Sequence, residues 1–428
     1  MVLQRDMGKL NNRTFPWSSA LLYGAVLLVA PFVSEYLFFL AFAVQVYRML
    51  RYDLRVNCMD LAFSISFSAI YRLPGGISYI VVYILLFNII FLIKSGKLYI
   101  GTGFALFVGA VGYIALRCSG QWDLLYFIFC GLMLLYLLYL SCGQTGHREV
   151  LCAFIAGVVI SSAFAFVFGE NPAIRAIIMQ DAEIRDQRFR GLFLDPNYYV
   201  TFVILAIVSL MCLNQSKRVH KIVYFGTIAF LIFAGAQTAS KSFVLMLVGA
   251  FAYYCISLFA QKKFWLGIGL SAGVALLFVL ATSGKIQLFQ AVIERFEDAE
   301  DLSGLTTGRI DIWFDYIAVI CSDPFVLLFG KGLDAPLVGG FGTHNVFIET
   351  IYNFGIVGFI LLVSFFAIVL KKIRIRLKDK GKRLPVRVLP IIAVMAMYAF
   401  LQGITSVLFY LGLFIMYECY GCSISNKF

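Results

Sequence analysis

Hydrophobic residues run along this chain in long blocks that short polar segments separate. Most blocks hold roughly 20 residues, the length that an α-helix needs to cross the hydrocarbon core of a bilayer. The breaks predict about fourteen spans, with centres near residues 25, 41, 66, 85, 107, 133, 159, 206, 229, 251, 273, 358, 396 and 414. The block near residue 66 is short and ends at Leu73-Pro74-Gly75-Gly76, which is typical of a tight turn. If this block belongs to one broken helix, the number of spans falls to about twelve.

Composition favours the same architecture. Of the 428 residues, 61% are hydrophobic and 14% are charged, whereas a soluble domain needs more polar cover. The first apolar block follows a basic tail and leads straight into the second block, which favours a signal anchor over a cleaved signal peptide. We therefore expect an all-α, polytopic membrane helical bundle in which residues 1–428 form a single integral membrane domain.

Charge predicts the orientation of this bundle. Most lysines and arginines lie in alternate connections between the blocks, and most acidic residues lie in the others. By the positive-inside rule, the basic connections and both termini face the cytoplasm. The largest basic segment, residues 371–387, is then a cytoplasmic loop close to anionic lipid. The net charge of +12 thus reflects topology, and a nucleic-acid patch is disfavoured because interleaved aromatic residues are missing from this segment.

Two connections on the predicted outer side are long, about residues 170–197 and 283–345. Long loops of this kind are usually functional or disordered. Both are rich in aromatic residues, Pro and Gly, so we expect folded loops that hold short helices. In residues 173–185, isoleucines recur near helical spacing, which predicts an amphipathic helix on the outer leaflet.

Within these loops, His344 is the candidate general base. The common signatures of nucleotide binding, metalloproteases and serine hydrolases are absent from the sequence. His344 lies at the end of the second outer loop, and an imidazole that titrates near neutral pH suits proton abstraction from a hydroxyl. The competing interpretation is a loop histidine that caps the next helix together with Asn345.

Several cations on the outer side run against the charge bias of the rest of the chain: Arg188, Arg190, Arg309 and Lys241. Guanidinium groups hold phosphate through paired hydrogen bonds, so a diphosphate at the membrane surface is a natural partner. Alternatively, the arginines pair with nearby carboxylates such as Asp195 or Asp311 and only order the loop. The sequence Asp195-Pro196-Asn197 predicts a turn and an N-cap for the following helix.

Four motifs in this region resemble the O-antigen ligase and polymerase superfamily. Residues 188–197 (RFRGLFLDPN) look like its R-x-G-x-F-x-D-P-N stretch, and Thr238-Ala-Ser-Lys-Ser242 is similar to its short polar break one hairpin later. Gly308-Arg309, followed by Trp313, resembles its large outer loop. His344-Asn345, followed by nine residues and then Gly355, resembles its H-N-x9-G signature. Lys241 departs from the arginine expected at its place, because lysine keeps the charge but loses the bidentate fork.

The resemblance implies a GT-C-like membrane glycosyltransferase at the outer face of the inner (cytoplasmic) membrane. Such an enzyme takes glycan from undecaprenyl diphosphate without metal, nucleotide sugar or other cofactor. A polymerase adds it to another lipid-linked repeat unit of an O-antigen, capsule or exopolysaccharide, and a ligase transfers it to a lipid or protein acceptor. The polymerase is the reading we favour here. A chain-length regulator and a flippase are then candidate protein partners, beside the lipid-linked glycan and the bilayer.

The resemblance also suggests roles for individual residues. Arg190 and Arg309 would bind the donor diphosphate, and His344 would face either the acceptor hydroxyl or the diphosphate. The remaining expected substrate-binding residues are Arg188, Lys241, Asp195, Asn197 and Asn345. A transporter or flippase of the lipid-linked glycan is the alternative from another class, but it would place ionisable residues at the middle of the spans. The charges of this sequence concentrate in the outer loops instead.

Overall fold

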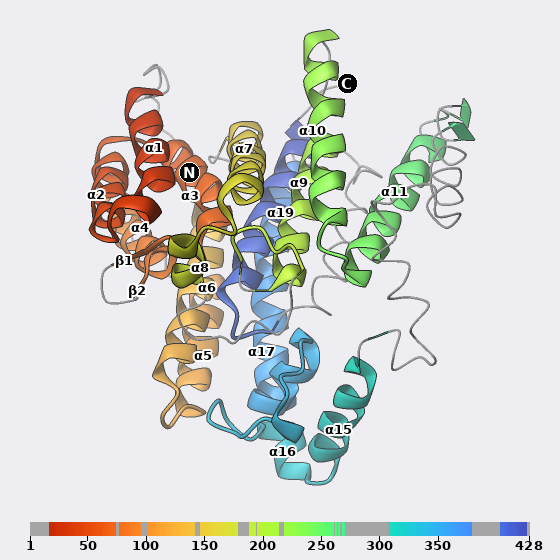
Figure 1. Cartoon of the computed structure of the whole chain (residues 1–428). Coiled ribbons are helices and arrows are strands. Elements are labelled where there is room, and N and C mark those ends of the chain that lie inside the picture. The colour runs from red at the N-terminus through yellow and green to blue at the C-terminus, as the bar shows by residue number, and fades with distance from the viewer. Residues whose placement is uncertain are drawn as a thin grey trace. The chain divides into compact units, whose positions relative to one another are not determined.

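The computed structural model of the chain describes residues 17–73, 77–95, 101–141, 146–178, 188–193, 195–213, 218–260, 262, 264–265, 268–269, 306, 308–378 and 403–425. These residues are helical almost throughout (Figure 1), and their only strands have two residues each. The expected all-α fold is therefore confirmed for the described part of the chain. The spans expected near residues 273 and 396 lie outside it, as do residues 283–305 of the second outer loop.

The chain divides into two compact units. The first comprises residues Met1–Lys97, Gln144–Arg185 and Gly191–Leu194, and the second comprises Leu98–Gly143, Asp186–Arg190 and Asp195–Phe428.

The first unit contains α-helices and a short β-hairpin. Its elements are α1 (Trp17–Val33), α2 (Tyr36–Arg51), α3 (Leu54–Ser64), the 3-10 turn η2 (Ile65–Phe67), β1 (Arg72–Leu73), β2 (Ile77–Ser78), α4 (Tyr79–Ser95), α7 (His147–Phe168) and α8 (Pro172–Ile178). Helix α3 lies against α7, and α1 lies against α2. Gly157 permits the first contact, because a Cβ atom there would sit 2.3 Å from the carbonyl oxygen of Phe63.

The span expected near residue 66 is wrong as a single crossing. Helix α3 has eleven residues, so it extends about 16 Å, roughly half the thickness of the hydrocarbon core. The chain then continues through η2 into β1, which pairs with β2 in antiparallel register, Arg72 opposite Ser78. This pairing confirms that the chain reverses between Leu73 and Ile77, as expected from the sequence. The number of spans stays a prediction.

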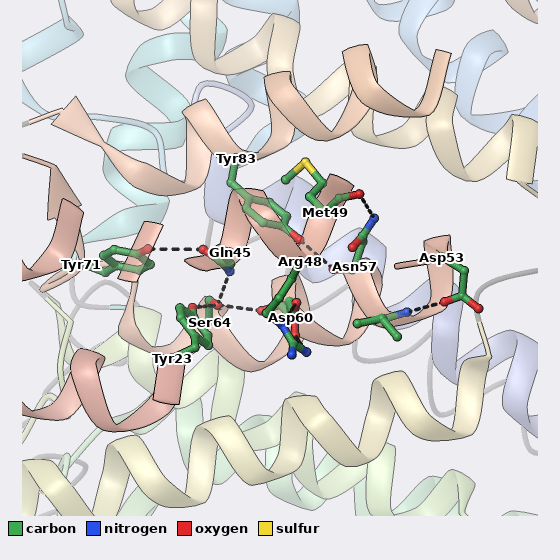
Figure 2. Close-up of polar contacts among 11 residues, drawn as sticks. Tyr23, Gln45, Arg48, Met49, Asp53, Asn57, Asp60, Ser64, Tyr71 and Tyr83 are labelled. Atoms are coloured by element: carbon green, nitrogen blue, oxygen red, sulfur yellow. Dashed lines mark hydrogen bonds and ion pairs between the residues drawn. The ribbon is translucent and has the colours of Figure 1, made fainter. Parts of the chain in front are cut away.

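A buried ion pair joins α2 to α3 (Figure 2). Two guanidinium nitrogens of Arg48 donate to the two carboxylate oxygens of Asp60, at 2.7 and 2.8 Å. Beside the pair, Gln45 donates to the hydroxyl of Ser64 and accepts from that of Tyr71. The structure leaves Arg48 no accessible surface, because α2 continues to Arg51 and Arg48 bonds to Asp60 of α3.

The amphipathic helix expected over 173–185 is confirmed only in its first half. Helix α8 covers Pro172–Ile178, and residues 179–185 lie outside the described part. Ile174 and Ile178 are buried, and α8 lies against α1. These two isoleucines therefore pack within the first unit instead of facing an outer leaflet.

The second unit is a larger helical bundle. It contains α5 (Thr102–Leu116), α6 (Trp122–Ser141), α9 (Pro196–Cys212), α10 (Arg218–Ala236), α11 (Lys241–Ala260), α15 (Arg309–Cys321), α16 (Pro324–Phe329), the 3-10 turn η4 (Val338–Gly340), α17 (Val346–Lys378) and α19 (Val407–Ser425). Helix α9 is buried along most of its length, because α10, α11 and α19 all pack on it. Helix α17 contacts α5, α6, α15 and α16.

Among the described residues, three helical stretches are long and apolar enough to cross a membrane: Trp122–Leu140, His147–Phe168 and Val346–Lys372. Shorter apolar helices include α9 and α19. Helix α17 continues to Lys378, so the first part of the basic segment 371–387 is helical and not a loop. Residues 308–345, called the outer segment after the side on which the sequence predicts them, contain α15, α16 and η4, which confirms that this part of the second long loop is folded.

Two glycines let α16 and α17 cross at backbone contact. Gly355 interrupts α17 with φ 65° and ψ −175°, and Gly330 ends α16 with φ 75°. A Cβ atom on Gly355 would lie 2.3 Å from the carbonyl of Leu328, and one on Gly330 would lie 2.4 Å from that of Asn353. Side chains other than hydrogen do not fit here, so these glycines fix the outer segment on the end of α17.

Candidate active site

The loop before α17 is held by hydrogen bonds from aromatic side chains. Trp313 of α15 donates its indole N–H to the carbonyl oxygen of Thr343 at 2.8 Å. The hydroxyl of Tyr316 donates to the carbonyl of Phe341 at 2.8 Å, and the hydroxyl of Tyr352 donates to that of Pro336 at 2.7 Å. Helix α15 and the first turns of α17 therefore fix residues 336–343 from both sides.

His344 follows residues 336–343 and has an unusual backbone conformation. Its φ is 46°, in the left-handed region that side chains with a Cβ rarely adopt. In the next residue, Asn345, the side-chain amide oxygen accepts hydrogen bonds from the backbone N–H groups of Phe347 and Ile348, at 3.0 and 3.2 Å. Asn345 thus caps α17, while the ring of His344 is half-buried and has no hydrogen bond to any described residue. The capping role proposed for both residues is correct for Asn345 alone; binding of substrate by Asn345 stays a prediction.

Arg309 is the first residue of α15. Gly308 precedes it with φ 75°, a conformation that favours glycine at this start. The guanidinium group is half-buried, and no carboxylate of the described residues lies within the 4.0 Å of an ion pair. The alternative in which Arg309 is neutralised by a direct pair with Asp195 or Asp311 is therefore wrong.

The Asp195-Pro196-Asn197 segment begins α9 as expected. A carboxylate oxygen of Asp195 accepts from the backbone N–H of Asn197 at 2.6 Å, and Pro196 occupies the first turn. The side-chain oxygen of Asn197 accepts a hydrogen bond of 2.8 Å from the hydroxyl of Ser240. This bond joins the start of α9 to the polar motif Thr238–Ser242. Lys241 of that motif is the first residue of α11. The structure thus brings together two of the motifs that the sequence separates.

Arg188 and Arg190 stand just before this cap. Both side chains are half-buried, and the aromatic ring between them, Phe189, packs edge-on against Tyr199 of α9 with centroids 5.5 Å apart. This contact anchors the short segment on α9. Diphosphate binding by either arginine stays a prediction.

Arg309, His344 and Asp195 act on one another electrostatically. Burial, and then the positive charge of Arg309, lower the pKa of His344 below its ordinary value, while Asp195 opposes the shift. Burial lowers the pKa of Arg309 as well, again opposed by Asp195 and also by Tyr198. At neutral pH His344 is therefore a neutral imidazole within electrostatic range of the Arg309 guanidinium. Such a pair can accept a proton at one group and hold an anion at the other.

Sequence reasoning missed two polar side chains of this region, Tyr198 and Glu349. Tyr198 follows Asp195 by three residues and lies within electrostatic range of Asp195 and Arg309. Glu349 lies one turn into α17, where its carboxylate accepts a hydrogen bond of 2.8 Å from the hydroxyl of Thr405. An acidic residue inside an apolar helix is itself a signal of function, and this signal was available in the sequence.

Comparison with protein-family models finds no match to this chain, and none of the curated proteins matches it.

Proposed function

We propose that this chain is a membrane glycosyltransferase of the outer face of the cytoplasmic membrane. It polymerises oligosaccharide repeat units that are linked to a polyprenyl diphosphate. The observation that carries the proposal is the half-buried Arg309, without a carboxylate partner among the described residues, beside a neutral His344. A guanidinium that no described carboxylate neutralises favours an anionic ligand such as a diphosphate, and a neutral imidazole can take a proton.

The reaction follows from these two groups. His344 accepts the proton of the acceptor hydroxyl, whose oxygen forms a bond to the anomeric carbon of the donor glycan. The bond from that carbon to the diphosphate oxygen breaks, and the polyprenyl diphosphate leaves with the electron pair. Arg309 stabilises the negative charge that grows on the leaving oxygen, a contribution typically of about 100- to 1,000-fold in rate for one such donor. Direct displacement inverts the anomeric carbon.

The remaining residues of the site have supporting tasks in this scheme. Arg190, Arg188 and Lys241 supply further positive charge for the diphosphate, whereas Asp195 and Asn197 hold the start of α9 in place. The long apolar helices of the described residues provide a surface for the polyprenyl tail. No step of the scheme needs a cofactor.

The decisive experiment gives purified protein only undecaprenyl-diphosphate-linked repeat units and follows the product on a gel. A polymerase forms a ladder of longer lipid-linked chains, and His344→Ala and Arg309→Ala abolish the ladder although both variants are produced and inserted. A ligase forms no ladder until a second acceptor is added, which would replace the polymerase assignment. Normal ladders from both variants would overturn the catalytic roles.

A further inference from the structure

Glu349 is a polar side chain of the site that the proposed reaction does not use. It lies on the first turns of α17, five residues after His344, and no other charged residue occurs in this helix before its basic end. A carboxylate in such surroundings is costly unless hydrogen bonds compensate its loss of water. The contacts of the Glu349 carboxylate therefore show which segments it connects.

These contacts join two distant parts of the second unit. One carboxylate oxygen of Glu349 accepts from the hydroxyl of Thr405 at 2.8 Å and faces the backbone N–H of the same residue at 3.4 Å. The other oxygen lies 3.5 Å from the hydroxyl of Thr343, which has a closer acceptor in the backbone carbonyl oxygen of Asn345 at 3.2 Å. A Cβ atom on Gly403 would lie 2.2 Å from that second oxygen, so glycine leaves room for the carboxylate.

Thr343 is the residue immediately before His344, and its hydroxyl also accepts from the backbone N–H of Asn345 at 3.2 Å. The carboxylate thus reaches the turn that carries His344 in its left-handed conformation. A strained residue keeps such a conformation only when its surroundings over-determine it. Trp313 fixes this turn from α15 through the carbonyl oxygen of Thr343. Glu349 connects it to the segment before α19.

We propose that Glu349 is a positioning residue for His344, acting through Thr343 and braced by Thr405. This inference rests on the proposed function, since it assigns Glu349 to the same transfer. The carboxyl group acts by geometry: one oxygen accepts a hydrogen bond from Thr405, the other lies against the hydroxyl of Thr343, and together they keep the imidazole where the acceptor hydroxyl arrives. It does not touch the substrate.

The test compares four variants in the chain-growth assay: Thr405→Val, Glu349→Ala, Glu349→Gln and Thr350→Val. Thr405→Val and Glu349→Ala should lower kcat by about ten- to a hundredfold with the KM for lipid-linked donor unchanged, as expected for a misplaced catalytic group. Glu349→Gln keeps an oxygen acceptor and should retain most of kcat. Thr350→Val is the matched control, because Thr350 is a buried threonine of α17 that bonds only to its own helix, at Val346.

An unchanged kcat in Thr405→Val and Glu349→Ala would overturn the proposal. An increase in KM alone would indicate contact with substrate and would overturn it too. Equal losses in Glu349→Gln and Glu349→Ala would show that the charge matters and not the geometry. If Glu349→Ala does not fold, Thr405→Val decides.

A second measurement separates this proposal from the proposed function. The imidazole NMR signal of His344, assigned by its loss in His344→Gln, should shift in Thr405→Val and stay at the wild-type position in Thr350→Val. An unshifted signal in Thr405→Val sinks the positioning role even if the enzyme is active. If the wild-type protein extends no lipid-linked glycan while the signal shifts, the proposed function fails and the structural link stands.

Discussion

Replacing Gly355 by alanine tests the backbone crossing that carries the outer segment. The new Cβ atom would lie 2.3 Å from the carbonyl carbon and oxygen of Leu328 and 2.4 Å from the nitrogen of Phe329. These are backbone atoms, which cannot swing away as the end of a side chain can. In addition, the φ of 65° with ψ of −175° belongs to a region that only glycine populates readily.

The magnitude follows from these two effects. Backbone strain of this kind costs about 1–3 kcal/mol, and overpacking in a tight contact costs about 1–3 kcal/mol. Together they predict a loss of about 2–6 kcal/mol, or at least about 4 °C in the midpoint of thermal unfolding for a unit of this size. Because α16 precedes the loop that ends at His344, chain growth should fall along with stability.

The assay is thermal unfolding of the purified protein in one detergent, beside the control Gly112→Ala. Gly112 lies in α5 with nothing within 4 Å of an added Cβ, so alanine there should be neutral or stabilising by up to about 1 kcal/mol. Gly330→Ala strains the same crossing from the other side. The double variant with Gly355→Ala should therefore lose less than the sum of the two single losses. A Gly355→Ala protein that melts like Gly112→Ala would refute the reasoning.

Two further predictions concern the charged groups. Because burial and Arg309 lower the pKa of His344, its neutral form should persist as pH falls below about 6.5, and kcat/KM should decline only at more acidic pH. An NMR titration of the Arg309→Gln variant should show a higher pKa for His344. An unchanged or lower pKa would contradict the electrostatic coupling. Removing one partner of the buried pair in Asp60→Leu should destabilise the protein by about 3–5 kcal/mol, whereas the double variant with Arg48→Met should recover most of the loss. Thermal unfolding compares the single and the double variant. Equal midpoints for these two variants would contradict the predicted recovery.

Local pattern predicted much of the fold. Apolar blocks became helices where they were expected, because a helix of apolar residues satisfies its own backbone hydrogen bonds and leaves only side chains to be buried. Asp195 caps α9 as its sequence indicated, since the cap needs only residues next to one another in the chain. Residue type and short spacing were enough for these features.

The sequence also directed attention to Arg309 and His344, but not to their surroundings. Whether Arg309 pairs with a carboxylate depends on distances between separate elements. The structure leaves Arg309 half-buried, and none of the described carboxylates forms an ion pair with it. The segment near residue 66 was misjudged for a similar reason. Its hydropathy is that of a span, yet its residues divide among α3, η2 and a hairpin that are buried within the first unit.

By itself, then, the sequence determined the helices, their caps and the outer loop in which chemistry is expected. Only the tertiary structure decided which polar groups meet. Asn197 bonds to Ser240, Arg48 to Asp60 and Glu349 to Thr405, each across a gap in the chain that no local period encodes. Hydrophobic periodicity specifies that a face is buried, since any apolar partner lowers its exposure to water. A hydrogen bond requires one particular partner at about 3 Å, and only the packing of whole helices brings that partner into place.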